Sequence, residues 1–274
     1  MRDGVSVKRS YRLVATDLDG TLFDHTLVIP PRTRQAFELA KSRGAKIVLA
    51  TGRMLPATLP FATSLGIDTP LITYQGAVIH DPKSGRDIWH HRMPLAETLE
   101  AINALRTSGM HLNLYVDHHL IIEEMTPAAA AYLELTGVTP LIVPRFENFL
   151  FSSTAPTKLL AIGTVEEADR WHKILFERFE EALYVTKSQA QFLELAPFGV
   201  TKGTALAHVA AKLNIQPAEI IAFGDGMNDA EMLAFAGLGV AMGNAPEELK
   251  KIADKVAPSI EEQGIAQVLE EIFG

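Results

Sequence analysis

Residues 13–21 read Leu-Val-Ala-Thr-Asp-Leu-Asp-Gly-Thr, an apolar run followed at once by two carboxylates. The apolar residues 13–15 predict a short buried strand that stops at an acidic pair. Similar apolar runs follow at 47–50, 71–74, 220–223 and 238–241, and a helical pattern between the first two runs closes near Gly44. Continuous apolar strands that alternate with helices predict a parallel sheet covered on both faces. The fold class is therefore α/β.

Three other polar segments belong with the acidic pair. They are Ala-Thr-Gly-Arg at 50–53, Thr-Lys-Gly at 201–203 and Gly-Asp-Gly-Met-Asn-Asp at 224–229. In open parallel sheets, ligands bind beyond the carboxyl ends of the strands. All four segments sit at such positions, so we expect them to converge.

Asp17 and Asp19 are two residues apart at a strand end, so their side chains can point to the same side. Two like charges ~4 Å apart repel by about 4 kcal/mol at an effective dielectric of 20. Mg²⁺, which prefers hard oxygen ligands, relieves that cost. We interpret Asp17 as a nucleophile towards phosphorus and Asp19 as a general acid and base. The alternative is a plain Asp-Gly turn.

Thr51 directly follows a predicted strand, so its hydroxyl and the following amides, starting with Gly52, can donate to a phosphate oxygen. The alternative for Thr51 is a helix N-cap. Arg53 is a candidate substrate contact, and the alternative is a solvated or salt-bridged arginine.

Thr201 is expected to cap a helix, which places Lys202 in the first turn. The helix dipole disfavours a cation there by about 0.3–1 kcal/mol, so Lys202 fits best if an anion shares the site. The alternative is a surface lysine. Asp225 is the best Mg²⁺ ligand candidate of the 224–229 segment, and Asn228 and Asp229 can hold metal-bound water or orient Lys202. The alternative for this segment is an acidic turn that caps the next helix.

Between residues 83 and 196 the sequence pattern changes. Residues 111–116 alternate in polarity, which predicts an antiparallel sheet with one packed and one open face. Helices over about 95–107 and 165–179 would cover the packed face. We therefore predict a core domain formed by residues 1–82 and 197–274, with a second α+β domain, residues 83–196, inserted into it.

Composition limits the classes of function. The chain has 274 residues, a net charge of −8 and no cysteine. The charge favours neither nucleic acid nor an anionic membrane as a partner, and a disulfide framework is impossible. No apolar run approaches the ~20 residues that span a bilayer, and the polar start of the chain is unlike a secretory signal. We expect a soluble cytoplasmic protein, and we interpret its paired histidines, 90–91 and 118–119, as surface or core residues without a shared metal.

The four segments together resemble the motifs of the haloacid dehalogenase (HAD) superfamily of phosphatases. Residues 238–245, Leu-Gly-Val-Ala-Met-Gly-Asn-Ala, and the later Lys250, Ala253-Asp254 and Gly264-Ile265 resemble the Cof-type sugar-phosphatase branch. The resemblance implies a Rossmann-like core with an α/β cap over the active site. It also implies Mg²⁺ bound by Asp17, the backbone carbonyl of Asp19, and Asp225.

The same resemblance implies phosphate contacts from Thr51 and Lys202, with Asn228 and Asp229 in support. One position departs from it: Gln75 stands where members often carry asparagine. Its longer amide can still donate to a substrate or to the loop. Asn244, followed three residues later by Glu247, reads as a capping box rather than a site residue.

The sequence thus predicts a Mg²⁺-dependent phosphatase of small phosphomonoesters, such as sugar phosphates or related metabolites, that works through an aspartyl phosphate on Asp17. His111, Asn113 and Tyr115 are candidate substrate contacts on the open face of the inserted sheet. A phosphomutase on the same scaffold and a non-catalytic, receiver-like sensor of Mg²⁺ and phosphate are the alternatives. Whether the protein is a monomer or a homodimer is left open.

Overall fold

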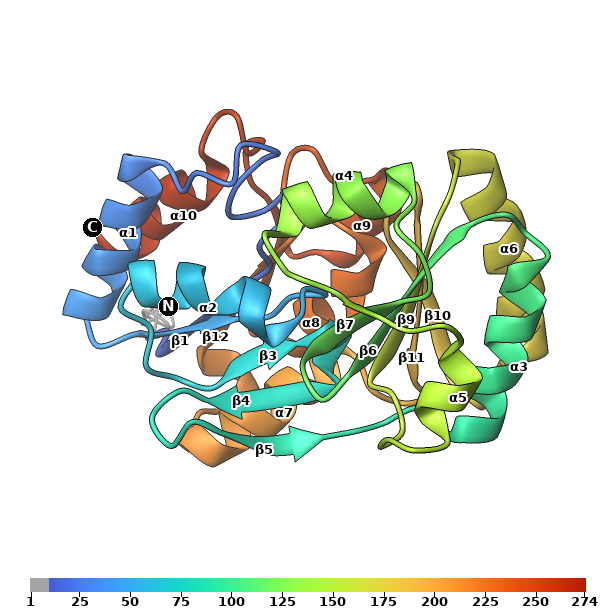
Figure 1. The fold of residues 1–274 in the computed structure, drawn as a ribbon. Coiled ribbons are helices and arrows are strands. Elements are labelled where there is room, and N and C mark those ends of the chain that lie inside the picture. The colour runs from blue at the N-terminus through green and yellow to red at the C-terminus, as the bar shows by residue number, and fades with distance from the viewer. Residues whose placement is uncertain (1–9) are drawn as a thin grey trace, which may run out of the picture.

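A computed structural model describes residues 10–274 of the chain. Most of the polar start of the sequence, residues 1–9, lies outside the described residues. Within them, three sheets are present: a five-stranded, a six-stranded and a three-stranded sheet (Figure 1). Among residues 10–274, no helix is both long enough and apolar enough to cross a membrane.

The five-stranded sheet is parallel throughout and has the strand order β14-β13-β12-β1-β2. Its strands are β1 (Leu13–Thr16), β2 (Lys46–Leu49), β12 (Ile220–Gly224), β13 (Leu238–Ala241) and β14 (Lys255–Val256). The central strand β1 is fully buried, because it pairs with β2 on one side and β12 on the other. The predicted parallel sheet is confirmed for four of its five runs.

Helices cover both faces of this sheet (Figure 1). One face packs against α1 (Pro31–Ser42), α2 (Leu55–Ser64) and α10 (Gly264–Phe273). The other packs against α7 (Lys202–Leu213), α8 (Ala230–Phe235) and α9 (Glu247–Ile252). The alternating residues of β1 divide between the two cores: Val14 faces the first, and Leu13 and Ala15 face the second. This is the three-layer α/β arrangement that the apolar runs predicted.

The remaining predicted strand, at residues 71–74, does not belong to the five-stranded sheet. β3 (Leu71–Thr73) pairs with β4 (Val78–Asp81), which pairs with β5 (Arg86–His90), in an antiparallel three-stranded sheet. β3 touches the parallel sheet through one parallel bridge, between Ala50 and Ile72. The structure therefore places this strand beside the core sheet rather than fully in it.

The elements from α3 to β11, here called the insert, form the second large unit. Its sheet has the order β10-β11-β9-β6-β7-β8. The strands are β6 (His111–Val116), β7 (His119–Ile122), β8 (Leu141–Ile142), β9 (Lys158–Ile162), β10 (Leu183–Gln189) and β11 (Phe192–Pro197). The helices are α3 (Leu95–Arg106), α4 (Pro127–Thr136), α5 (Phe146–Leu150) and α6 (Val165–Arg178). Figure 1 shows α3 and α6 on the side of this sheet that faces away from the core.

The predicted open face of residues 111–116 is wrong, because all six residues of β6 are buried. Leu112, Leu114 and Val116 pack under α3 and α6, as predicted. The opposite face meets the core: Tyr115 packs edge-to-face on Tyr74, with ring centroids 5.9 Å apart. The predicted division at residues 82/83 and 196/197 remains a prediction. Its first boundary falls in the turn between the paired strands β4 and β5.

Candidate active site

The carboxyl ends of β1, β2 and β12 meet at one edge of the core sheet, beneath the insert. A cavity of about 50 Å³ lies there. From the core it is lined by Asp17, Asp19, Thr51, Gly52, Arg53, Lys202, Asp225, Gly226 and Asn228. The four segments singled out in the sequence therefore converge, although they are separated by up to about 200 residues.

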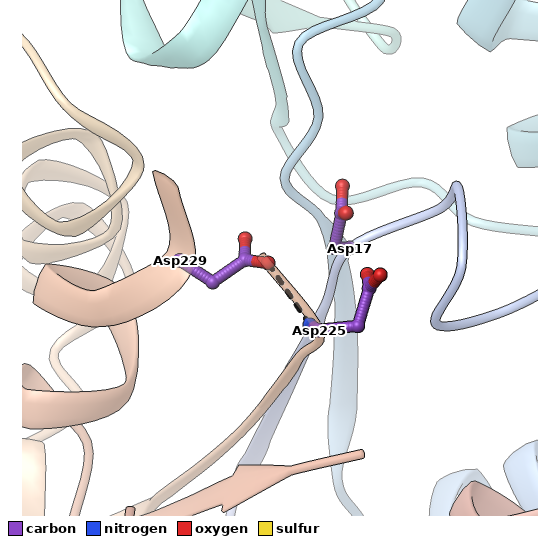
Figure 2. Close-up of side chains that lie close together, drawn as sticks. All are labelled: Asp17, Asp225 and Asp229. Carbon is purple, nitrogen blue, oxygen red and sulfur yellow. Dashed lines mark hydrogen bonds between the residues drawn. The ribbon is translucent and has the colours of Figure 1, made fainter. Parts of the chain in front are cut away.

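Three carboxylates gather at the floor of the cavity, where Asp17 and Asp225 line it and Asp229 lies buried beside them. Asp17, Asp225 and Asp229 each offer an oxygen, and these oxygens all lie within 4.8 Å of one another (Figure 2). Asp229 is held by the loop itself, since its Oδ2 accepts hydrogen bonds from the backbone N–H groups of Asp225 and Gly226, both at 3.1 Å. Thr21 donates to Asp225 Oδ1 at 2.7 Å. The cluster is a candidate cation site.

Lys202 supplies a fixed positive charge beside this cluster. Thr201 caps α7 by accepting from Thr204 N, which confirms the predicted helix start. Lys202 Nζ then lies 2.8 Å from Asp17 Oδ1 and 2.7 Å from Asp229 Oδ1, with the lysine side chain fully buried. The surface-lysine alternative is therefore wrong.

Burial dominates the electrostatics of the floor. It raises the pKa of Asp17 well above its ordinary value, although Lys202 opposes the effect. Burial, and after it the charge of Asp229, raises the pKa of Asp225 to about 7. For Lys202, burial favours the neutral form, but Asp17 and Asp229 outweigh it and the pKa is raised. Burial and mutual repulsion thus disfavour the ionised forms of these carboxylates, and a divalent cation bound here would stabilise them.

Gly20 makes the close approach of two segments possible. It has φ +77°, a conformation that residues with a side chain rarely adopt. A Cβ atom at this position would lie 2.2 Å from Asp225 Oδ2. Glycine in the Asp-Gly-Thr segment therefore both shapes the turn after β1 and leaves room for the Asp225 carboxylate.

Asp19 lies apart from the three clustered carboxylates. Its carboxylate pairs with Arg53, whose guanidinium lies over the rings of Phe23 and Phe61 at 5.4 and 5.6 Å from the centroids. Arg53 is thus the salt-bridged arginine of the alternative interpretation, yet it lines the cavity. Thr51 does not cap a helix, because α2 begins later with Met54 as its N-cap. Its Oγ1 accepts from Arg53 N at 3.1 Å.

The structure does not bring every predicted contact to the cavity. Gln75 is buried behind it, between Asn228 and the insert. Tyr115 donates its hydroxyl to Tyr132. His111 and Asn113 bond to each other, and His111 lines a separate pocket beside Arg106 and Glu123.

Sequence reasoning missed the residues that the insert contributes. They are Tyr132, Leu135, Thr136, Lys158, Leu160, Ser188, Gln189, Phe192 and Glu194. One signal was present: Lys158 and Glu194 are charges inside otherwise apolar strands, and both are buried. Buried charges are rarely tolerated unless they are paired, so such positions mark an interface or a site.

Two further interpretations are settled by contacts elsewhere. The capping box at Asn244 is wrong, since Pro246 is the N-cap of α9. Asn244 instead donates to Gly20 O and accepts from Ile260 N. The neighbours His118 and His119 diverge as expected: His118 reaches Asp87 at 2.8 Å, while His119 is exposed.

Comparison with known proteins identifies this arrangement. Residues 14–269 match the family model described as haloacid dehalogenase-like hydrolase. The chain belongs to the haloacid dehalogenase-like hydrolases. The Cof-type resemblance seen in the motifs is confirmed, and the match runs through the insert as well as the core.

Several relatives of this hydrolase are phosphatases by name. The HMP-PP phosphatase of Serratia proteamaculans is 31% identical over 270 residues, covering 95% of this chain and 94% of that protein. The 5-amino-6-(5-phospho-D-ribitylamino)uracil phosphatase YitU of Bacillus subtilis is 29% identical, covering 95% and 97%. The solved structure of a sugar phosphatase of HAD subclass IIB is 26% identical, with a TM-score of 0.82 over 95% of this chain and 98% of that one. The predicted enzyme class, a HAD-type phosphatase, is confirmed.

Proposed function

We propose that the enzyme is a Mg²⁺-dependent phosphatase of small phosphomonoesters that forms an aspartyl phosphate on Asp17. The observation that carries the proposal is the position of the Asp17 carboxylate. It is buried at the floor of the cavity, 2.8 Å from a fixed ammonium group and beside two further carboxylates. Two neighbouring carboxylates would not help a nucleophile that acted alone, but they would help it to bind a cation.

The donor set fits Mg²⁺. The carboxylate oxygens of Asp17 and Asp225 are hard ligands, and Mg²⁺ binds through one or two carboxylates while it keeps several waters. With the backbone carbonyl of Asp19, they are the proposed ligands, and Asp229 and Asn228 lie close enough to hold bound water. When bound, the ion offsets the charge of the carboxylates and of the phosphoryl oxygens.

The chemistry then divides among the chain's own residues. The Asp17 carboxylate attacks phosphorus, and the bond to the leaving oxygen breaks as Asp19 protonates that oxygen. Asp19 next takes a proton from water, and the water oxygen attacks phosphorus. The bond between Asp17 and phosphorus breaks, which releases inorganic phosphate and restores the Asp17 carboxylate. Lys202 holds Asp17 in place and compensates phosphoryl charge, and Thr51 and the Gly52 N–H are the proposed phosphate donors.

The insert is the proposed cap, and it covers the cavity in this structure, an arrangement here called the closed position. The cavity of about 50 Å³ is smaller than the roughly 300 Å³ or more of typical small-molecule sites, so we propose that the insert moves to admit a substrate. Its wall is rich in hydrogen-bonding groups, from Lys158, Ser188, Gln189 and Glu194. Such a wall suits a hydroxyl-bearing leaving group. We therefore propose sugar phosphates or related polar metabolites as substrates.

Phosphate release by Asp17→Asn, with and without Mg²⁺, tests the proposal. The wild-type enzyme should release phosphate from an aryl phosphate only with the metal, and Asp17→Asn should release none. The matched control is Asp24→Asn, which removes a half-buried carboxylate a few residues along the same loop. Equal release by Asp17→Asn and Asp24→Asn would exclude the assigned nucleophile. Turnover of nucleotides or pyrophosphate alone, with sugar phosphates inert, would exclude the substrate class.

A further inference from the structure

A continuous chain of hydrogen bonds crosses twice between the core and the insert. Asn228 Nδ2 donates to Gln75 Oε1 at 3.1 Å, and Gln75 Nε2 donates to Glu194 Oε2 at 3.0 Å. Glu194 pairs with Lys158 at 3.2 Å within the insert. Lys158 Nζ then returns to the core, donating to Gly52 O at 2.8 Å. Both ends of the chain, Asn228 and Gly52, line the catalytic cavity.

Gln75 is the only core side chain in the middle of this chain, and its length matters. Its amide bonds to one residue of each unit: it accepts from Asn228 in the core and donates to Glu194 in the insert. It also fills the space beside Gly52, where an added Cβ would lie 2.4 Å from Gln75 Nε2. An asparagine side chain is one methylene shorter, so it cannot keep both contacts from the same backbone position.

The backbone conformation at Gln75 is less favourable for glutamine than for the shorter asparagine. Gln75 has φ +59° and its neighbour Tyr74 has φ +53°. Asparagine tolerates this left-handed region better than glutamine does. Residues held in such conformations cluster at sites where the surroundings fix them, and Gln75 is 1% exposed.

The ion pair between Lys158 and Glu194 reaches its core partners only in the closed position. The side chains of Lys158 and Glu194 are 2% and 4% exposed, and a buried ion pair is tolerated when further hydrogen bonds complete it. Ser188 supplies one of these to Glu194 from within the insert. Gln75 and the Gly52 carbonyl supply the others from the core. Opening the insert breaks these two contacts together.

We propose that Gln75 is a positioning residue that latches the closed insert onto the core through Glu194 and, in the same contact, holds Asn228 at the catalytic loop. The inference rests on the proposed function in one respect: closure is needed for turnover. Turnover requires closure of the insert over bound substrate, so loss of the latch should lower kcat more than it raises KM.

A charge swap separates this role from simple packing. Gln75→Glu keeps the shape and still accepts from Asn228, but it places a carboxylate against Glu194. We expect kcat to fall about tenfold or more, the value of a hydrogen bond to a charged group. Gln75→Glu combined with Glu194→Gln restores a donor–acceptor pair with reversed polarity. We expect the double variant to recover most of the kcat that Gln75→Glu loses, so that its kcat approaches that of Glu194→Gln alone.

Gln75→Asn provides a second, independent test of the latch, because it shortens the side chain without adding a charge. Asparagine suits the backbone, so thermal stability should be unchanged or higher while kcat falls. Hydrogen exchange at residues 51–54 reports opening without turnover, and it should become faster in Gln75→Asn and Gln75→Glu. A merely structural role would instead lower stability and activity together.

These outcomes are distinguishable from failure of the proposed function. An inactive wild-type enzyme would overturn the phosphatase proposal, while the exchange rates would still test the latch. Wild-type exchange at residues 51–54 in both single variants would overturn the latch. An active Gln75→Glu enzyme that the second substitution does not improve would overturn it as well.

Discussion

Arg53 donates two hydrogen bonds to the carboxylate of Asp19, from Nε to Oδ2 at 2.7 Å and from Nη2 to Oδ1 at 2.6 Å. The arginine side chain is only 8% exposed. Such a bidentate pair fixes direction as well as charge. It holds Asp19, the proposed acid and base, in the wall of the cavity, and one of the two bonds must be released when Asp19 carries a proton.

Arg53→Met should therefore lower kcat by about ten- to a hundredfold, a part of the 10²–10⁴-fold that general acid–base catalysis supplies. Arg53→Lys keeps the charge but lacks the planar fork, so it should fall between wild type and Arg53→Met. Steady-state kinetics on one sugar phosphate measures both. A Met variant with wild-type kcat would show that the pair does not orient Asp19 for catalysis.

Lys202→Met should destabilise the fold by about 3–5 kcal/mol, because it leaves Asp17 and Asp229 buried without their cation. Lys212→Met makes the same chemical change at an exposed position of α7 and should cost less than about 0.5 kcal/mol. Urea unfolding of the metal-free proteins compares them. Equal losses in the two variants would mean that Lys202 does not offset the buried charge.

Gly20→Ala should weaken Mg²⁺ activation, since the new methyl group would press on the Asp225 carboxylate. Gly109 is the matched control: its φ of +78° is close to the +77° of Gly20, and a Cβ there meets no atom within 4 Å. Both alanine variants carry about 1–2 kcal/mol of backbone strain. Only Gly20→Ala should need more Mg²⁺ for half-maximal rate. The same Mg²⁺ requirement in both would remove the steric explanation.

The raised pKa of Asp225 predicts how the stability of the metal-free protein depends on pH. Its value of about 7 lies above the ordinary 3.8, so between these values the folded protein holds a proton that the unfolded chain has lost. Stability therefore falls as pH rises from about 4 to about 7. Asp225→Asn holds no such proton and should gain stability relative to wild type over that window.

Urea unfolding in chelator at pH 5 and pH 8 measures the difference. The advantage of Asp225→Asn should be larger at pH 8, and Mg²⁺ should stabilise wild type most at that pH. An advantage that is the same at both values would mean that Asp225 does not titrate in this window.

Local sequence was sufficient to predict the core and its part of the site. The buried strand before Asp17 and the cap at Thr201 are each determined within a few residues, and parallel pairing then brings their ends together. The contribution of the insert depends instead on how two sheets pack. Alternation in residues 111–116 distinguishes two faces of β6, but it does not reveal that the core covers the second one.

Local sequence also does not predict the hydrogen-bond partners of Gln75 and Asn244. Each has a plausible local partner in sequence, yet each bonds to segments more than 15 residues away. Lys158 and Glu194 come together only through the pairing of β9 with β11. Long-range contacts of this kind leave no periodic pattern in the chain.

Chemical trapping can identify the residue that carries the phosphoryl group during turnover. The enzyme would be mixed with substrate and Mg²⁺, quenched within milliseconds, reduced with borohydride and digested for mass spectrometry. An aspartyl phosphate is reduced to homoserine, so we expect homoserine at position 17 and at no other aspartate position. Turnover without any modification of Asp17, or reduction at Asp19 or Asp225 instead, would contradict this expectation.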